Sequence, residues 1–279
     1  MSFDVYQMVT DRIIAMLEQG QIPWERPWTG AGSLAIKYAS GKPYSLLNQM
    51  LLGNPGEYLS FREAQKAGGH IKKGAKAKVV VFWKLLDMEE KKDGKIVIRQ
   101  IPILKYMYVF HIDDCEGVRP KHTEETVFRD FDPIQKAEDI ITAYLERSGV
   151  TLEHVKQGRA YYSPVEDKVV LPLKEQFKTV AGYYDTAYHE LTHSTGHSSR
   201  LDRLQAGSFS FGDESYSKEE LVAEIGSATI MSLLGIETDA TIRNNAAYIQ
   251  SWLKALKGDK RLIVSAASRA QKAVELIMG

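Results

Sequence analysis

Residues 189 to 193 read His189-Glu190-Leu191-Thr192-His193, a stretch that predicts a helix carrying a metal centre. Four residues make slightly more than one helical turn, so His189 and His193 lie on the same helix face and can bind one cation. Glu190 lies one step round the helix, where its carboxylate can take a proton from an attacking water. The spacing therefore predicts both a pair of ligands and a catalytic base.

The residues around this motif also favour a helix. The stretch from residue 179 to 188 has an inward face at helical spacing, and Gly196 is a natural place for the helix to end. The residues expected on that face are Ala181, Tyr184, Ala187, Tyr188 and Leu191. The alternative interpretation is a buried helix with two hydrogen-bonded core histidines and no metal.

A catalytic zinc site takes a third protein ligand and keeps its fourth position open. In the extended form of the motif that ligand is a histidine at position 199, but the residue here is Ser199. His197 follows a predicted helix end, so its direction is not set. The only cysteine, Cys115, lies far upstream without a partner. The third ligand is therefore expected from another element.

A second predicted helix, over residues 217–235, offers that ligand. It is apolar around most of its circumference, yet it carries Glu220 and Glu224 four residues apart on one face. Buried carboxylates are costly unless a positive group meets them. We predict Glu220 as the third ligand and Glu224 as an outer carboxylate that accepts a hydrogen bond from a ligating histidine. The reverse assignment and an exposed charged stripe remain open, and Glu219 is expected in solvent.

This ligand set predicts zinc (Zn2+), with another divalent metal possible, and peptide hydrolysis as the reaction class. Zinc lowers the pKa of a bound water to around neutrality, and Glu190 would take the proton. A side chain that stabilises the developing oxyanion is also expected. The candidates are Tyr161, Tyr162, Tyr183, Tyr184 and His197.

The composition is that of a globular protein of two modest domains: 279 residues, a net charge of zero and one cysteine. No apolar run approaches membrane-spanning length and the first residues do not resemble a signal peptide, so we expect a cytoplasmic protein with no membrane partner. Helices are expected at 4–19, 44–52, 60–67, 133–147, 217–235, 239–256 and 259–278. A hairpin of 78–86 and 95–104 joined by a charged loop, a further strand at 105–112, and a strand or hairpin at 161–172 complete the expected elements.

Charge is distributed unevenly, with a basic first part up to about Pro120 and no acidic residue between Glu63 and Asp87. Aromatic residues are interleaved with these lysines, an arrangement that suits stacked bases and contacted phosphates of a single strand. Core packing of the rings and solvated lysines would explain the same pattern, and Val80 and Phe82 are expected in the core. The predicted DNA contacts are Trp24, Trp28, Tyr44, Lys72, Lys73, Lys76, Lys78 and Trp83.

Both halves resemble one known family. Trp24-Glu-Arg-Pro-Trp28, Ser40-Gly-Lys-Pro-Tyr-Ser-Leu-Leu-Asn48, the lysine-rich stretch before Val79-Val-Val-Phe-Trp83, and Tyr108-Val-Phe-His-Ile-Asp-Asp-Cys-Glu-Gly117 resemble the N-terminal domain of ArdC-type antirestriction proteins. The segments His189–Asp202 and Glu219–Gly226 resemble that family's C-terminal zincin-like metallopeptidase domain. The resemblance covers nearly the whole chain.

The resemblance implies an α+β protein of two domains. An N-terminal α+β domain with a small antiparallel sheet, residues 1–120, would bind single-stranded DNA, and a mostly helical zincin-like domain, residues 121–279, would bind the metal. Such proteins are carried by conjugative plasmids and other mobile elements and protect incoming DNA from restriction. Two other hypotheses remain open: a zinc metallopeptidase whose N-terminal domain recognises a protein or peptide substrate, and a DNA-binding module with a structural metal.

Overall fold

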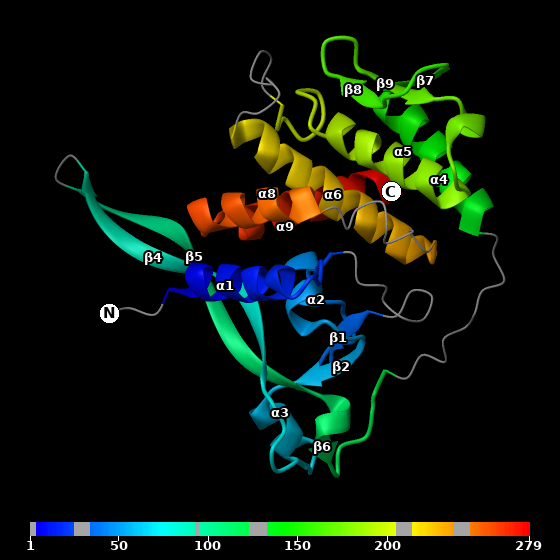
Figure 1. The fold of residues 1–279 in the computed structure, drawn as a ribbon. Helices are drawn as coiled ribbons and strands as arrows, with labels where there is room; N and C mark the ends of the chain where they lie inside the picture. The colour runs from blue at the N-terminus through cyan, green and yellow to red at the C-terminus, as the bar shows by residue number, and fades with distance from the viewer. Residues whose placement is uncertain (1–3, 25–33, 93–94, 123–132, 205–213, 237–245) are drawn as a thin grey trace.

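The computed structural model describes residues 4–24, 34–92, 95–122, 133–204, 214–236 and 246–279. It is an α+β structure in which a sheet-containing N-terminal half lies beside a mainly helical C-terminal half (Figure 1). Trp28, one of the predicted DNA contacts, lies outside the described residues.

The N-terminal half is built on a four-stranded sheet of order β1-β2-β5-β4. The β1 and β2 strands run parallel, and the other neighbours are antiparallel. A separate antiparallel pair, β3 and β6, lies at one end. The elements are α1 (Val5–Glu18), β1 (Ala35–Lys37), α2 (Leu46–Leu52), β2 (Gly56–Leu59), α3 (Phe61–Lys66), β3 (His70–Ile71), β4 (Lys78–Lys92), β5 (Lys95–His111), the 3-10 turn η1 (Ile112–Asp114) and β6 (Cys115–Glu116).

Local signals set the limits of these helices. The Asp4 side chain caps α1 by accepting from the Gln7 amide at 3.2 Å. Ser60 and Glu63 form a reciprocal capping box at the start of α3. Gly53, at φ 74°, ends α2 in the left-handed conformation that glycine adopts at no steric cost. These three helices lie within two residues of their predicted limits.

The hairpin of β4 and β5 is longer than predicted. Its ladder runs from Lys78 opposite Val109 to Lys92 opposite Lys95, and the hairpin extends beyond the helices (Figure 1). The expected charged loop at 87–94 and the separate strand at 105–112 were therefore wrong. Backbone pairing continues through the charged segment because the projecting ladder leaves its polar side chains in solvent. One exposed cross-strand pair is also hydrogen-bonded, with Gln100 donating to Asp87 at 3.0 Å.

The C-terminal half places helices against a three-stranded sheet of order β7-β9-β8, with β7 parallel and β8 antiparallel to β9. Among the described residues, no helix combines the length and apolar character needed to cross a bilayer. The elements are α4 (Pro133–Ser148), β7 (Thr151–Val155), β8 (Tyr161–Ser163), β9 (Lys168–Pro172), the 3-10 turn η2 (Lys174–Gln176), α5 (Val180–Ser194), α6 (Glu214–Leu234), α8 (Ala246–Gly258) and α9 (Leu262–Met278). The first residues of the helix predicted at 239–256 lie outside the described part.

The two halves share a hydrophobic core. One cluster joins α1 and α2 to α6, α8 and α9, and a second packs α4, β9, α5, α6 and α9 together. Trp24 belongs to the first cluster: it is 2% exposed and meets Trp252 edge-to-face, with ring centroids 5.1 Å apart. Val80 is buried as predicted, but the same prediction for Phe82 was wrong, since 43% of Phe82 is exposed.

Candidate metal centre

The metal centre is carried by α5 and α6, the first of which is fixed by capping and burial. Thr179 caps α5 by accepting from the Gly182 amide at 3.0 Å, and Tyr184, Ala187, Tyr188 and Leu191 are buried. The helix ends at Ser194, two residues before Gly196. A side chain at Gly196 would collide with Leu204, whose Cγ would be 2.6 Å from the added Cβ. The predicted limits of this helix were therefore close to those found.

The second helix, α6, packs closely across α5. Leu221, Val222 and Ile225 are each at most 1% exposed, as the apolar pattern predicted. A Cβ built on Gly226 would lie 2.7 Å from Cγ2 of Thr192, so glycine allows the two helices to approach here. This close approach places the start of α6 opposite the histidines of α5.

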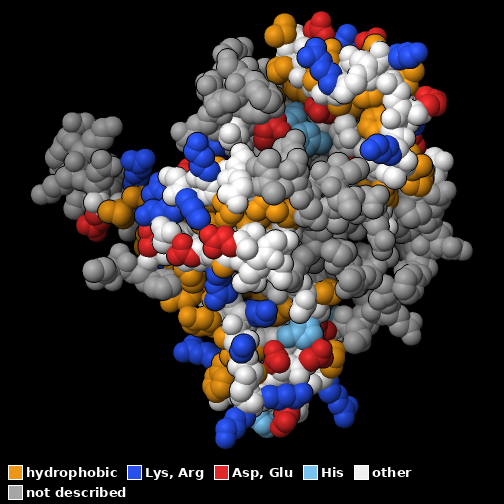
Figure 2. Space-filling model, in the orientation of Figure 1, with side chains coloured by type: hydrophobic (Ala, Val, Ile, Leu, Met, Phe, Trp, Pro, Cys, Tyr) orange, Lys and Arg blue, Asp and Glu red, His pale blue; other side chains and the backbone are white. Residues whose placement is uncertain are grey.

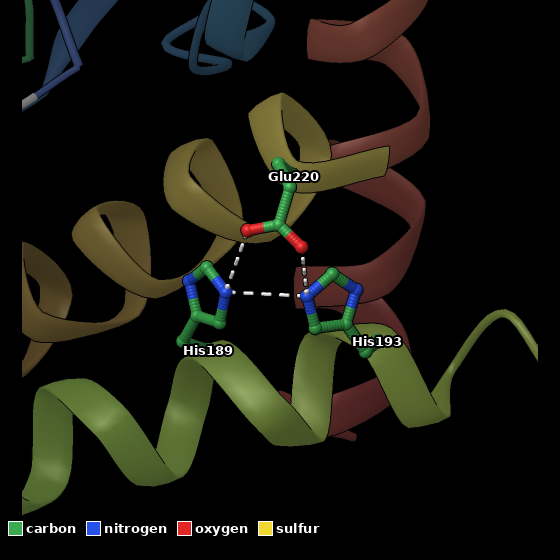
Figure 3. Close-up of side chains that lie close together, drawn as sticks. All are labelled: His189, His193 and Glu220. Carbon is green, nitrogen blue, oxygen red and sulfur yellow. Dashed lines mark hydrogen bonds and ion pairs between the residues drawn. The ribbon is translucent and has the colours of Figure 1, made fainter. Parts of the chain in front are cut away.

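His189, His193 and Glu220 form a small triangle of donor atoms (Figure 3). The two Nε2 atoms are 3.2 Å apart. Glu220 Oε2 lies 3.5 Å from His189 Nε2, and Glu220 Oε1 lies 3.3 Å from His193 Nε2. Three ligand atoms that each lie about 2.0 to 2.1 Å from a tetrahedral zinc are separated by about 3.3 to 3.4 Å. Each of the three measured pairs is therefore spaced like two ligand atoms of one cation, and the donors are the nitrogen and oxygen atoms that a divalent metal takes.

The centre is accessible from solvent on one side. The side chains of His189, His193 and Glu220 are 16%, 13% and 28% exposed. Figure 2 shows histidine and acidic side chains together on the molecular surface in the region of α5 and α6. Glu190, beside the first histidine on α5, is 8% exposed. The three side chains are therefore partly open to solvent, whereas Glu190 is largely shielded from water.

Opposite charges hold the centre together. Burial by itself would lower the pKa of His193, but Glu219 and Glu220 overcome this and raise it to about 10. Burial would raise the pKa of Glu220, but the two histidines hold it well below its ordinary value. A divalent cation would take the place of the histidine protons among these carboxylates, so metal binding should release protons.

Two further glutamates of α6 face the outer nitrogens of the histidines. Glu224 Oε1 lies 3.7 Å from His189 Nδ1, where an outer carboxylate was predicted, and Glu219 Oε1 lies 3.7 Å from His193 Nδ1. The prediction that Glu219 is solvated was wrong, since it is 4% exposed. Arg203 holds this carboxylate through Nη2 at 2.7 Å and Nε at 3.2 Å. The periodicity of α6 could not reveal this, because Arg203 comes from the segment after α5.

Three of the four tyrosines considered for oxyanion stabilisation have hydroxyl groups engaged elsewhere. The Tyr162 hydroxyl donates to Asp167 at 2.7 Å, and the Tyr184 hydroxyl donates to Glu138 at 2.7 Å. The Tyr183 hydroxyl lies 3.0 Å from Nε2 of His154. These hydroxyls therefore help to pack the helices of the C-terminal half.

The predicted DNA contacts do not form one surface. Trp24 is in the shared core, so the prediction that it is free to stack on a base is corrected. Tyr44 is half-buried, with Lys37 5.6 Å from its ring centroid, whereas 52% of Trp83 is exposed. The lysines lie elsewhere: Lys72, Lys73 and Lys76 are exposed around β3, in the region where basic side chains project in Figure 2, and Lys78 is half-buried at the start of β4.

Both halves of the chain match known protein families. Residues 3–110 match the family described as the N-terminal domain of anti-restriction factor ArdC, and residues 137–269 match the zincin-like metallopeptidase family. The antirestriction protein ArdC from plasmid R388 is 38% identical, with 99% of this chain and 97% of that chain covered. The TM-score is 0.77 for its metal-free crystal structure and 0.76 for its Mn(II)-bound one. This chain belongs to the ArdC family.

Other relatives of this chain differ in length. The uncharacterised protein y4eC of Sinorhizobium fredii is 32% identical over 96% of this chain and 90% of its own length. Two DNA primases TraC of Escherichia coli are 34% and 32% identical over 98% of this chain. The chain spans only 27% and 20% of the length of those two primases. The same two-part unit therefore also occurs within much larger proteins.

Proposed function

We propose that this chain is an antirestriction protein of a mobile element, which binds single-stranded DNA and carries a zinc-dependent peptidase-like centre. The observation that carries the proposal is the donor triangle of His189, His193 and Glu220 with Glu190 beside it, in a chain that matches an antirestriction protein over almost its whole length. In this proposal, residues 1–120 form the DNA-binding half and residues 121–279 form the peptidase-like half.

Each residue of the centre would have a separate role in such a site. His189, His193 and Glu220 would hold the metal, and two imidazole nitrogens with one carboxylate oxygen are donors that zinc prefers. When bound, zinc polarises a carbonyl and makes water acidic near neutral pH. Glu190 would orient the attacking water and accept its proton. Glu219 and Glu224, facing the outer ring nitrogens, would keep both imidazoles turned toward the metal.

The support for DNA binding is the exposed basic and aromatic side chains of the N-terminal half. The lysines around β3 lie in solvent, and Trp83 presents a large ring on β4. Cations that contact phosphates and rings that stack on bases bind a single strand without reading its sequence. A protein that meets DNA of any sequence during transfer needs this kind of binding.

Metal analysis of the purified chain tests the centre. We expect His189→Ala to lose the bound zinc, because one of three protein ligands is removed. Glu190→Gln should keep the metal but lose peptide hydrolysis, because the proton acceptor is gone. His197→Ala is the matched control, since its imidazole bonds Ser199 outside the triangle. Undiminished zinc in His189→Ala would refute the assignment.

Binding and protection assays test the biological role. Binding to labelled oligothymidine should weaken steeply as salt rises, because counterions are released when phosphates are contacted. Absence of binding at low salt would refute the DNA assignment. If Glu190→Gln protects DNA from restriction as well as the wild type does, then hydrolysis is not the means of protection.

A further inference from the structure

A groove runs between the edge strand β4 and the helix α9, where the two halves of the chain meet. It consists of two adjoining hollows of about 380 and 500 Å3, which share Trp83, Val264, Ser268 and Lys272 in their walls. Hollows of this size accept ligands rather than single waters. β4, which lines the groove, is the edge strand of the sheet.

The wall formed by β4 exposes an aromatic ring. Trp83 is 52% exposed, whereas Val81, two residues earlier on the same face of the strand, is 6% exposed. Trp83 meets Tyr6 of α1 edge-to-face at 6.4 Å, so the second hollow is bordered by two rings. Large exposed rings beside a hollow are costly in water, and they are the surfaces on which unpaired bases stack.

The lining of the groove carries an excess of positive charge. The two hollows are lined by five cations, Lys37, Lys218, Arg261, Arg269 and Lys272, against two carboxylates, Asp259 and Glu275. Asp259 is paired with Lys218 at 3.6 Å, and Glu275 accepts from Gln271 at 2.9 Å. Arg269 and Lys272 are exposed, and neither has an ion-pair partner within the described part of the chain. Since the whole chain carries no net charge, this local excess favours a polyanion.

We propose that a short stretch of single-stranded DNA lies in this groove, with a base against Trp83 and phosphates against Arg269 and Lys272. The inference rests on the DNA binding proposed above and gives it a place. That place is not confined to the N-terminal half, since α9 supplies the cations.

The position of the groove also connects DNA to the metal centre. Lys218 and Val222 of α6 line it, and the Glu220 carboxylate between them in sequence meets the histidines of α5. A strand in the groove would therefore contact the helix that supplies the third metal ligand.

The experiment is oligothymidine binding by the full chain, measured by fluorescence anisotropy at several salt concentrations. Arg269→Gln combined with Lys272→Gln should lower the salt slope by about 1.4, since each phosphate contact on a single strand contributes about 0.7. Trp83→Ala should weaken binding roughly tenfold through lost stacking. Lys156→Gln with Lys178→Gln removes the same charge from exposed sites outside the groove and should leave the slope unchanged. Equal thermal stability and zinc content would show that each variant is folded.

The outcomes separate the two proposals. If the wild type does not bind oligothymidine, the proposed DNA function fails and the groove assignment fails with it. If the wild type binds but the groove variants bind as tightly, DNA binding stands and only this placement is refuted. Loss of slope in Lys72→Gln with Lys73→Gln alone would move the strand to the β3 end. If the groove variants lose affinity for an acidic peptide and not for DNA, the occupant is a protein and the placement is again refuted.

Discussion

At the level of single residues, His189 and His193 each face a carboxylate of α6 on either side of the ring. The Nε2 atoms converge near Glu220, while the Nδ1 atoms face Glu219 and Glu224. Such outer carboxylates set the tautomer and the basicity of a ligand. Glu219 differs from its counterpart in being held by a forked arginine, so the orientation of His193 depends on Arg203.

This dependence can be tested with a pair of arginines. Arg203→Lys keeps the charge but loses the fork on Glu219, and we expect zinc affinity to fall by about 10- to 100-fold in competition with a chelator. Arg200→Lys is the matched control: both side chains are 6% exposed, and both hold a carboxylate and a carbonyl at the end of α5. Arg200, however, pairs with Asp167, away from the ligands. Equal losses of affinity in both variants would mean that Arg203 acts only on stability.

The ion pair between Arg200 and Asp167 leads to a prediction about how stability depends on pH. Burial would raise the pKa of Asp167, but hydrogen bonds from Arg200 and Tyr162 overcome this and lower it. Because the pKa of Asp167 is lower in the folded state than in the unfolded chain, where it is about 3.9, the ionised carboxylate stabilises the fold at pH values above about 3.9. This stabilisation is lost as the pH falls through the pKa of the folded state. Asp167→Asn should therefore melt below the wild type at neutral pH, and the difference should close below about pH 4. A difference independent of pH would contradict the charge-based explanation.

At the level of elements, the sequence predicts the features that neighbouring residues determine. The cap at Thr179 and the apolar face of α6 place the two helices that carry the predicted ligands, and Ser60 sets the start of α3 in the same local way. Features that depend on distant partners were missed: the burial of Trp24 needs Trp252, and the burial of Glu219 needs Arg203. The full length of the β4–β5 hairpin was missed because its ladder continues through charged residues that on their own suggest a loop.

The packing of α5 on α6 gives a prediction at this level. Gly226→Ala places a methyl group 2.7 Å from Cγ2 of Thr192, so the helices must separate. We expect a loss of about 1 to 3 kcal/mol in stability, together with weaker metal binding as Glu220 moves away. Thr192→Ala in the same chain should restore part of both. Gly258→Ala in α8 is the control, since an added Cβ there meets nothing within 4 Å. Unchanged metal affinity in Gly226→Ala would show that the ligands tolerate helix separation.

At the level of the whole molecule, the shared core ties the N-terminal half to the helices behind the metal centre. Residues of α1, α2 and β4 pack in one cluster with residues of α6, α8 and α9. Two domains joined by such an apolar interface should unfold together, since neither can expose that surface cheaply. The groove between β4 and α9 would then keep its shape as one unit.

Trp24 tests this unity, since its ring lies in the shared cluster against Trp252. Trp24→Ala should cost about 3 to 5 kcal/mol, the usual effect of emptying a buried tryptophan site. We expect calorimetry of the zinc-bound chain to show one unfolding transition, which shifts to lower temperature in the variant. In both the wild type and the variant, zinc should be released at the temperature of that transition. Trp83→Ala is the control, because that ring is 52% exposed and its loss should leave the melting temperature unchanged. Two transitions, with only the zinc-independent one shifted by Trp24→Ala, would show that the halves fold separately and that the interface between them does not couple DNA to the metal.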